Sequence, residues 1–346
     1  DGIGQEVIPV GLHVLEEAAR IEGFELEPEE FPWGCEYYLE TGRMMAEDWQ
    51  DQLRGFETIY FGACGWPERV PDHVSLWGMI LPIRKQFDLY ANVRPVKLLK
   101  GVRGPLVGKG PGDIDILCVR ENTEGEYAGV GGRLNQGTPD EVALQTAVFT
   151  RRSTERIIRY AFDLARQRRK QLASITKSNA QQYGMVFWDE VTAAVARDYP
   201  DVAWRSYHVD AAAARFVTHP ETLDVVVASN LFADILTDVG GAIQGSLGLA
   251  ASANIDPERR NPSLFESVHG SAPDIMGMGI ANPIATIWAG SLMLDFLGER
   301  SAAQRVMRAI ERVTEEAKFL TPDMGGVANT KEVGEAVQQA LHEVGE

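Results

Sequence analysis

Residues 225–241, VVVASNLFADILTDVGG, begin as an apolar strand and end with two aspartates, Asp234 and Asp238, four positions apart. A helix that begins near Asn230 places both carboxylates on one face, because side chains four residues apart stack on a helix. The ordinary interpretation of such a pair is a solvated polar face. Its position favours another interpretation, since ligands of open α/β sheets bind at the carboxyl ends of strands, where a divalent cation would relieve the repulsion.

The rest of the chain alternates short apolar strands with amphipathic helices. Residues 3–20 have apolar side chains at helical spacing, and residues 57–63 are aromatic and branched like a buried strand. The same patterns predict strands at 113–119, 141–149, 171–176, 203–209 and 223–229, and helices at 154–168 and 184–199. This alternation predicts an α/β protein with a largely parallel sheet.

Residues 127–149 differ from this pattern. A glycine-rich turn is followed by an alternating strand, with no helix between them. This arrangement is typical of a protruding hairpin or arm, which would suit a contact between two copies of the chain.

Composition excludes several classes of partner. The chain has 346 residues, 45% of them hydrophobic, which is enough for a substantial core in two lobes. Its formal net charge of -17 would repel nucleic acid and anionic lipid, so we expect neither as a partner. The longest apolar run, 284–298, is short and contains Asp295, so no membrane span is expected.

Three widely spaced cysteines favour a reducing compartment, and a cytoplasmic location is expected. The beginning at Asp1 is abrupt, so we also expect residues before it that the sequence does not include.

The expected cation site uses oxygen ligands alone. Because no His/Cys cluster accompanies Asp234 and Asp238, Mg²⁺ or Mn²⁺ is favoured over zinc. Asp210 is a candidate third ligand, since it also ends a strand candidate and starts a helix. It could equally be a simple N-cap.

Three arginines form a second group of candidates. Arg84 and Arg94 lie in an otherwise apolar segment, and Arg120 directly follows the apolar strand 113–119. Any one of them could form a surface salt bridge. Together with a metal, three guanidiniums would make a receptor for a small dicarboxylate, because each planar group can hold a carboxylate with two hydrogen bonds.

Tyr127 and Lys177 are candidates for proton transfer. Tyr127 follows a glycine-containing turn and Lys177 ends an apolar strand, so both could project into a cleft. A lysine near a metal and arginines would be a competent base, and a neighbouring tyrosine could return a proton to carbon. Either could instead be a surface side chain with a partly buried stem, and spacing alone does not decide between these interpretations.

The glycine-containing motifs that could bind a dinucleotide do not match those of a classical Rossmann fold. Neither GIGQEV, residues 2–7, nor GVGGRL, residues 129–134, is a G-x-G-x-x-G turn between strand and helix, so a classical Rossmann fold is not supported. Residues 265–287 instead form a loop-like stretch rich in small residues, whose N–H groups could approach a nucleotide. Asp274 within it could accept hydrogen bonds from a ribose and repel a 2′-phosphate, which favours NAD over NADP.

A series of motifs, in order and along nearly the whole chain, resembles the metal-dependent β-decarboxylating dehydrogenases that include isocitrate and isopropylmalate dehydrogenases. These motifs are DGIGQEV, ANVRP, VRENTEGEY, TKSNA, VVASNLFADILTDVGG, FESVHGSAPDI, ANPIATI and TPDMGG. Within the family, the chain looks most like the branch of tartrate and decarboxylating D-malate dehydrogenases. The motifs of that branch are CEYYLETGRMM, YFGACGWPERVPDHVSLWG and TKSNAQQYGMVFWDE.

The resemblance implies an isopropylmalate-dehydrogenase-like α/β fold, a two-domain sandwich with a mixed sheet. A discontinuous cofactor domain would comprise 1–92 and 246–346, and a substrate, metal and dimerisation domain 93–245, with a clasp arm at about 128–148. Lys177 and Asp210 would reach the active site of the other subunit of a homodimer. The family's first strand and the proline-glycine before DGIG are absent from this sequence, which leaves that strand unaccounted for.

The resemblance also implies roles for single residues. Tyr127 and Lys177 would be the acid/base pair, and Asp210, Asp234 and Asp238 the metal ligands. Substrate would contact Arg84, Arg94, Arg120, Trp77 and Ile80, the last two narrowing the pocket for malate or tartrate. Cofactor would contact Asn179, Glu266, His269, Gly270, Ser271, Ala272, Asp274 and Asn282.

The expected activity is NAD- and metal-dependent oxidation of D-malate or tartrate, with decarboxylation of D-malate to pyruvate. The resemblance to the branch also implies a requirement for a monovalent cation such as K⁺. The alternatives are 3-isopropylmalate dehydrogenase and a non-catalytic metabolite-binding protein.

Overall fold

The structure is a computed structural model that describes residues 1–345 and divides the chain into two compact units. Unit 1 contains residues 1–89, 97–111 and those from 241 onward, and unit 2 contains 90–96 and 112–240. We expected domain boundaries at 92/93 and 245/246, which lie a few residues from the observed divisions at 89/90 and 240/241. Segment 97–111, expected in the second domain, packs with unit 1 instead. The cofactor and substrate roles of the two domains remain predictions.

Unit 1 is an α/β layer with a three-stranded sheet. Its strands are β1 (Thr58–Phe61), β9 (Ala251–Ile255) and β10 (Ser263–Ser267). Their order is β1-β10-β9, with β1 parallel and β9 antiparallel to β10, which makes the sheet mixed as expected. Its helices are α1 (Gly4–Glu22), α2 (Cys35–Thr41), α3 (Trp49–Leu53), α4 (Asp72–Gly78), α5 (Ile80–Gln86), α10 (Ile284–Leu297), α11 (Arg300–Glu316) and α12 (Thr330–Glu343), with short 3₁₀ turns at Leu247–Leu249 and Pro322–Met324.

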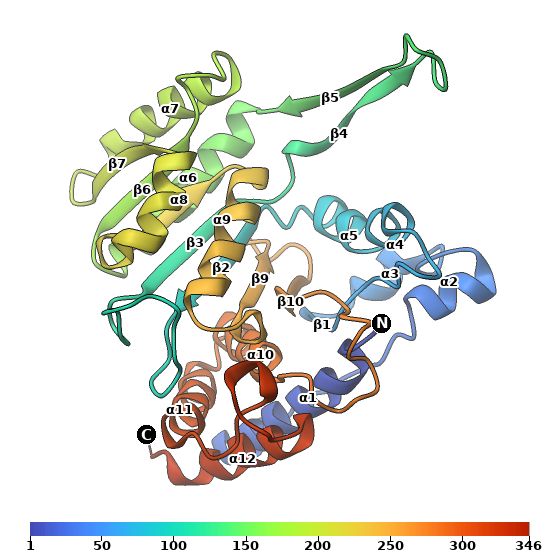
Figure 1. Ribbon diagram of the computed structural model, residues 1–346, viewed down its shortest axis with the longest axis vertical. Coiled ribbons are helices and arrows are strands. Elements are labelled where there is room, and N and C mark those ends of the chain that lie inside the picture. Colours follow the sequence, from blue (N-terminus) through green and yellow to red (C-terminus); the bar gives the residue numbers. More distant parts are fainter. Residues whose placement is uncertain (346) are drawn as a thin grey trace. The chain divides into compact units, whose positions relative to one another are not determined.

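Four of these helices pack together in unit 1. Helix α1 contacts α10, α11 and α12, and α10 also lies against β9 and β10 (Figure 1). Helix α10 is apolar on all sides, which is typical of a helix enclosed by the core. Among residues 1–345, no helix combines the length and the apolar character that a bilayer crossing requires.

Unit 2 is built on a five-stranded sheet. Its strands are β2 (Ala91–Lys97), β3 (Asp115–Glu121), β6 (Gln171–Thr176), β7 (Ala203–His208) and β8 (Val225–Ala228), in the order β2-β3-β8-β6-β7. The pairs β3/β8, β8/β6 and β6/β7 are parallel. All four residues of β8 are buried, because the strand lies between two others and is covered by helices on both faces.

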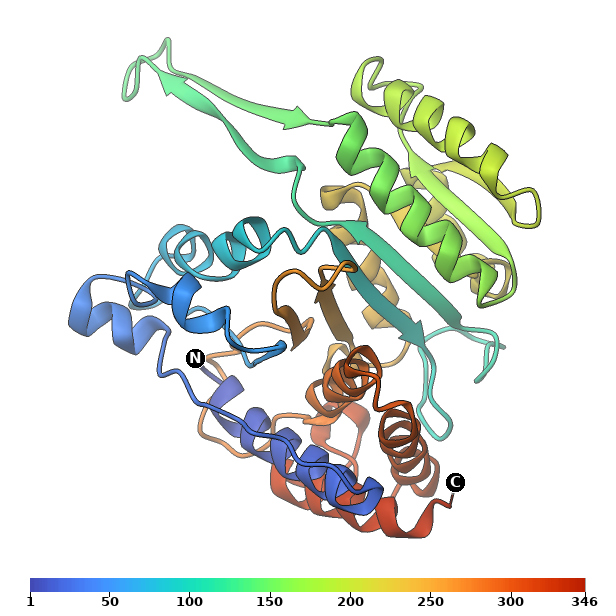
Figure 2. The ribbon, with the colours of Figure 1, turned by 180° about the vertical axis from the view of Figure 1, so that it is seen from behind.

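The helices of unit 2 connect these strands. They are α6 (Arg151–Arg166), α7 (Gly184–Val195), α8 (Val209–Thr218) and α9 (Asn230–Ile243), with short 3₁₀ turns at Ala196–Asp198 and Pro220–Thr222. Helices α6 and α7 cover one face of the sheet, and α8 and α9 the other (Figures 1 and 2). Helix α9 crosses the division between the units at residues 240 and 241.

The expected arm is present. Strands β4 (Gly125–Leu134) and β5 (Val142–Val148) form a separate antiparallel hairpin that projects from unit 2 (Figure 2). Most of its side chains are exposed, including Val130, Leu134, Val142 and Leu144.

Candidate active site

The junction between β8 and α9 has the form that the sequence predicts. The buried strand ends at Ala228, and α9 begins at Asn230. Four polar residues of α9, Asn230, Asp234, Thr237 and Asp238, follow the spacing i, i+4, i+7 and i+8 and therefore share one side of the helix. We refer to these four residues as the α9 polar face.

Two predicted arginines contact the α9 polar face. Arg120, at the end of β3, donates from Nε and Nη2 to Asn230 Oδ1 at 2.9 and 2.7 Å, and its Nη1 pairs closely with Asp234. Arg94, on β2, donates from Nη1 to Thr237 Oγ1 at 2.6 Å and lies 3.6 Å from Asp234 Oδ1. Both guanidiniums are buried, so their positions are fixed by these contacts.

Tyr127 joins the same cluster. Its hydroxyl donates to Asp234 Oδ2 at 3.0 Å, and the Arg120 guanidinium lies 5.7 Å from the centre of its ring. Partial burial and the negative charge of Asp234 raise the pKa of Tyr127 above its ordinary value. The phenol therefore keeps its proton at neutral pH, as a proton donor requires.

Asp234 and Asp238 have the properties of a cation site. Partial burial, and then the charge of Asp234, raise the pKa of Asp238. A hard divalent cation would offset both effects, and carboxylate oxygens are the ligands it prefers. Within residues 1–345, however, the structure gathers no group of three His, Cys, Asp or Glu side chains suited to a metal. A third protein ligand would have to come from outside this arrangement.

Asp210 lies with Lys177 instead. Strands β6 and β7 pair in parallel with Thr176 opposite His208, so the residues that follow them are neighbours. Lys177 Nζ lies 2.7 Å from Asp210 Oδ1, and this contact lowers the pKa of Asp210. Within one chain Asp210 therefore does not join Asp234 and Asp238, because it lies at the start of α8, after β7, whereas they lie on α9, after β8. Asn179, two residues beyond Lys177, is exposed.

Arg84 belongs to unit 1. Its Nη2 donates to Glu266 Oε1 at 2.6 Å, and the same oxygen accepts from Asn254 Nδ2 at 2.7 Å. Glu266, expected to contact the cofactor, therefore holds Arg84. Of the two expected pocket residues, Trp77 is 67% exposed, whereas Ile80 is buried in a core cluster with Ile83 and Phe87.

The expected cofactor loop, residues 268–283, has neither helix nor strand. His269 Nδ1 lies 3.3 Å from Ser267 Oγ and 3.2 Å from the Gly270 carbonyl oxygen, whereas its Nε2 is buried without a hydrogen-bond partner. Burial lowers the pKa of His269, so the ring is neutral at neutral pH. A neutral imidazole with a buried nitrogen that lacks a partner fits a polar ligand such as a nucleotide.

The other loop residues differ in their surroundings. Asn282 Nδ2 donates to Asp323 Oδ2 at 3.0 Å, and Asn282 Oδ1 accepts from the Ile284 amide. The Ser271 carbonyl accepts from the Ile3 amide, while Gly270 and Asp274 are exposed and Ala272 is half-buried with a positive φ of 41°.

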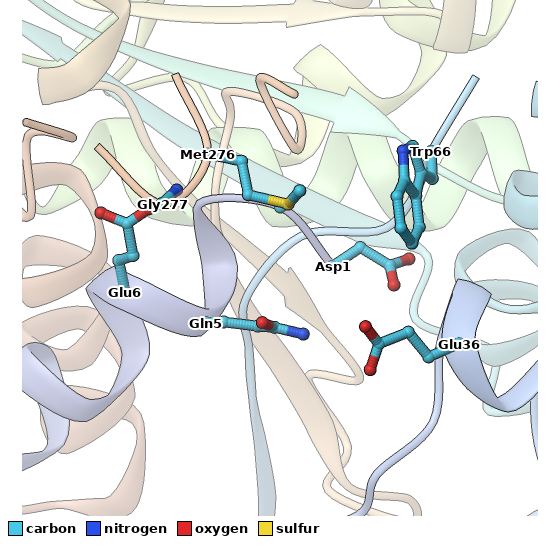
Figure 3. Close-up of a pocket in the computed structure, with 8 residues that line it drawn as sticks. Asp1, Gln5, Glu6, Glu36, Trp66, Met276 and Gly277 are labelled. Atoms are coloured by element: carbon cyan, nitrogen blue, oxygen red, sulfur yellow. Dashed lines mark hydrogen bonds between the residues drawn. The ribbon is translucent and has the colours of Figure 1, made fainter. Parts of the chain in front are cut away.

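A cavity of about 190 Å³ lies beside this loop in unit 1 (Figure 3). Its lining includes Met276 and Gly277, which follow the expected cofactor residues, and three acidic side chains, Asp1, Glu6 and Glu36. Glu6 accepts hydrogen bonds from the Gly277 and Gly279 amides at 2.6 and 3.0 Å, which holds the loop against α1. None of the predicted site residues lines the cavity.

Three functional candidates were missed in the sequence. Asn230 and Thr237 bind the predicted arginines, and Asp323 binds the predicted Asn282. The first two had a detectable signal, since the polar spacing of α9 includes them together with the aspartates. Asp323 belongs to the TPDMGG motif, residues 321–326, but nothing in that motif indicates its contact with Asn282.

The chain is similar to known proteins along nearly its whole length. The isocitrate/isopropylmalate dehydrogenase family matches residues 1–337. The decarboxylating D-malate dehydrogenase of Escherichia coli strain K12 is 56% identical over 97% of this chain and 95% of its own length. The tartrate dehydrogenase/decarboxylase of Pseudomonas putida is 52% identical over 99% and 95%.

A solved structure shows the same fold. The isocitrate dehydrogenase of Methylococcus capsulatus superimposes with a TM-score of 0.88, at 33% identity, over 99% of this chain and 97% of that one. The fold that the resemblance implied is therefore confirmed. This chain belongs to the isocitrate/isopropylmalate dehydrogenase family, whose members are in general NAD(P)- and divalent-metal-dependent dehydrogenases.

Proposed function

We propose that this protein oxidises the small 2-hydroxy dicarboxylates D-malate and tartrate, with NAD and Mn²⁺ or Mg²⁺, and converts D-malate to pyruvate and CO₂. The observation that carries the proposal is the α9 polar face, where two buried guanidiniums, a protonated tyrosine and two carboxylates meet. The identities of 56% and 52% to enzymes named for these substrates favour them over 3-isopropylmalate.

The arginines would bind the substrate carboxylate that is not attached to the reacting carbon. Arg94 and Arg120 are buried and fixed, so they can orient a carboxylate without further loss of side-chain freedom. Arg84 is the third proposed contact, with Trp77 and Ile80 near it in sequence. An oriented dicarboxylate would present its C2 hydrogen to the nicotinamide.

Asp234 and Asp238 would hold the divalent cation, with Asp210 supplied by a second copy of the chain. A cation held there would lower the pKa of the C2 hydroxyl. The pairing of Asp210 with Lys177 within its own chain supports this arrangement. The same copy would bring Lys177, so the proposed unit of activity is a homodimer with shared sites.

Lys177 of the second copy would accept the hydroxyl proton while hydride leaves C2 for NAD. With D-malate, the product is a β-keto acid, which breaks its bond to the second carboxylate and releases CO₂. The electron pair of that bond remains on the three-carbon fragment. Tyr127 would then give its proton to C3, which yields pyruvate.

NAD would bind at the 268–283 loop. His269, Gly270, Ser271, Ala272 and Asn282 would contact the adenosine, with Asn179 as a further contact. Asp274 is exposed on this loop, and its negative charge would disfavour a 2′-phosphate. A monovalent cation such as K⁺ is a further proposed requirement.

A substrate panel tests the proposal. D-malate, L-tartrate and 3-isopropylmalate are each supplied with Mn²⁺ and NAD, and NADH absorbance and pyruvate are measured. We expect NADH from the first two substrates and pyruvate from D-malate. Preferred oxidation of 3-isopropylmalate would assign the protein to the other branch, and no NADH from any substrate, with cation bound, would indicate a binding protein. NADP in place of NAD tests the role of Asp274.

A further inference from the structure

The groups that accept hydrogen bonds from arginine side chains differ across the protein. Arg84 is held by the Glu266 carboxylate, and on the surface of unit 2 Arg159 and Arg166 are held by Asp198 and Asp201. This is the ordinary arrangement in a chain with 50 acidic and 33 basic residues. A carboxylate partner fixes a guanidinium but also neutralises it.

Arg120 donates two of its hydrogen bonds to a neutral partner. Asn230 is buried, its Oδ1 accepts from both Nε and Nη2 of Arg120, and its Nδ2 donates to the Glu124 carbonyl oxygen at 2.9 Å. The orientation of the amide is unambiguous, because a guanidinium only donates and a carbonyl only accepts. The side chain is thus fixed at both ends and places Arg120 without adding a charge.

Thr237 does the same for Arg94. Its hydroxyl hydrogen is directed to the backbone of its own helix, where the Ala233 carbonyl oxygen lies at 2.8 Å. The oxygen is left to accept from Arg94 Nη1 at 2.6 Å. Asn230 and Thr237 are seven positions apart on α9, so a single helix face presents both neutral acceptors.

Asp234 is the carboxylate that both guanidiniums share. It pairs with Arg120 and lies 3.6 Å from Arg94. Asp238, four positions further along α9, also interacts electrostatically with both guanidiniums. A carboxylate at position 230 would add a further negative charge to this group while leaving an acceptor for Arg120.

We propose that Asn230 and Thr237 are positioning residues that hold Arg120 and Arg94 through neutral oxygens, so that no further negative charge is added where a dicarboxylate would bind. The proposal rests on the proposed substrate class. It adds that the neutrality of the two acceptors, and not only their geometry, determines affinity for the dianion.

The test uses Asn230→Asp in the full-length protein, with malonate as a dicarboxylate that cannot be oxidised at C2. Calorimetry measures malonate binding with and without Mg²⁺, NAD binding is measured separately, and KM and kcat are determined for D-malate. We expect malonate to bind about tenfold more weakly, and KM for D-malate to rise similarly, because an added charge within a few ångströms opposes the dianion. NAD binding should not change. Gln339→Glu adds the same charge to an exposed position of α12 and serves as the control.

Unchanged malonate affinity in a folded Asn230→Asp protein would overturn the proposal. So would equal losses of malonate and NAD binding together with a lowered melting temperature, since those indicate a purely structural role. If Asn230→Asp does not fold, Thr237→Val, which has nearly the same shape, replaces it and should weaken malonate binding without weakening NAD binding. A wild-type protein that binds malonate but oxidises no panel substrate would refute the proposed function and leave this inference standing.

Discussion

The Tyr127 hydroxyl donates a hydrogen bond to Asp234 Oδ2 at 3.0 Å. Tyr127 lies in the hairpin that follows β3, and Asp234 lies in α9, which follows β8. A proposed proton donor and a proposed metal ligand are therefore directly linked. We expect Tyr127→Phe to slow pyruvate formation about a hundredfold, which is typical of the loss of a general acid. Oxidation of D-malate to the keto acid should fall much less, because the phenol acts after hydride transfer.

Stopped-flow detection of NADH, compared with steady-state pyruvate release, separates these two steps. Tyr37→Phe, in α2 of unit 1, is the matched control and should behave as wild type. Equal slowing of both steps by Tyr127→Phe would show that the hydroxyl only supports Asp234.

Lys177 provides a second prediction, because its pairing with Asp210 separates it from the α9 carboxylates of the same chain. Lys177→Ala should reduce D-malate turnover at least a hundredfold, since a general base is lost. Lys170→Ala removes an exposed lysine that lies 3.7 Å from Asp201 and should leave turnover unchanged.

A mixing experiment tests whether the sites are shared. Lys177→Ala and Tyr127→Phe proteins, each nearly inactive in pyruvate formation, are unfolded together and refolded, and pyruvate formation is measured. If each site uses residues from both copies, mixed dimers have one intact site, and about a quarter of wild-type activity should return. No recovery, with mixed dimers demonstrated, would place Lys177 and Tyr127 in the same copy's site.

Cation binding gives a third prediction, which needs no turnover. Without divalent cation, Asp238→Asn should melt at or above the wild-type temperature, because it removes a partly buried charge beside Asp234. With excess Mg²⁺, wild type should gain stability through binding, and the variant should gain little. The order of the two melting temperatures should therefore reverse, and an equal gain for both proteins would exclude Asp238 as a ligand.

The sequence was sufficient where local pattern determines structure. Strand β6 was predicted with its observed bounds, and the hairpin of β4 and β5 and the β8–α9 junction were also predicted. Each of these features depends on the spacing of apolar residues over a short stretch of sequence. The fold was predicted from the match to the family motifs.

The sequence was insufficient where spatial order determines contacts. The strand order β3-β8-β6-β7 makes Arg120 a neighbour of α9 and makes Lys177 a neighbour of Asp210, and no local pattern contains that order. Asn230 and Arg120 are 110 positions apart, so their hydrogen bonds could not be read from either segment. Segment 97–111 follows a strand of unit 2 and groups with unit 1, and no local pattern indicates that grouping.

A pH-dependent prediction concerns Glu22 in α1. Hydrogen bonds from Ser301 and Arg305 hold the pKa of Glu22 below its ordinary value. Arg305 also donates to the Leu341 and Val344 carbonyl oxygens, so the pair connects α1, α11 and the end of α12. A lowered pKa means that Glu22 stabilises the fold above its ordinary pKa and that this contribution is lost as pH falls through the lowered value.

Glu22→Gln should therefore lower the free energy of unfolding by about 1 kcal/mol at neutral pH, as for a hydrogen bond to a charged group. The difference from wild type should shrink as the pH is lowered through the acid range. Urea unfolding at several pH values measures it. Glu29→Gln, at an exposed position, should show no such difference, and a Glu22→Gln deficit that is constant with pH would contradict the role of the charge.

Asp224 gives the last prediction, since its carboxylate is fully enclosed between β8 and the end of α6. It accepts from Arg168 Nε at 2.8 Å and from the Arg169 amide at 2.9 Å. Asp224→Ala leaves these donors without their acceptor in a buried position, which should cost about 3 kcal/mol. Asp201→Ala removes an exposed carboxylate that pairs with Arg166, so it should cost much less than Asp224→Ala. Urea unfolding of the two variants, monitored at Trp188, which is buried in α7 of the same unit, measures both effects. Similar losses of unfolding free energy would show that burial does not determine the strength of these pairs.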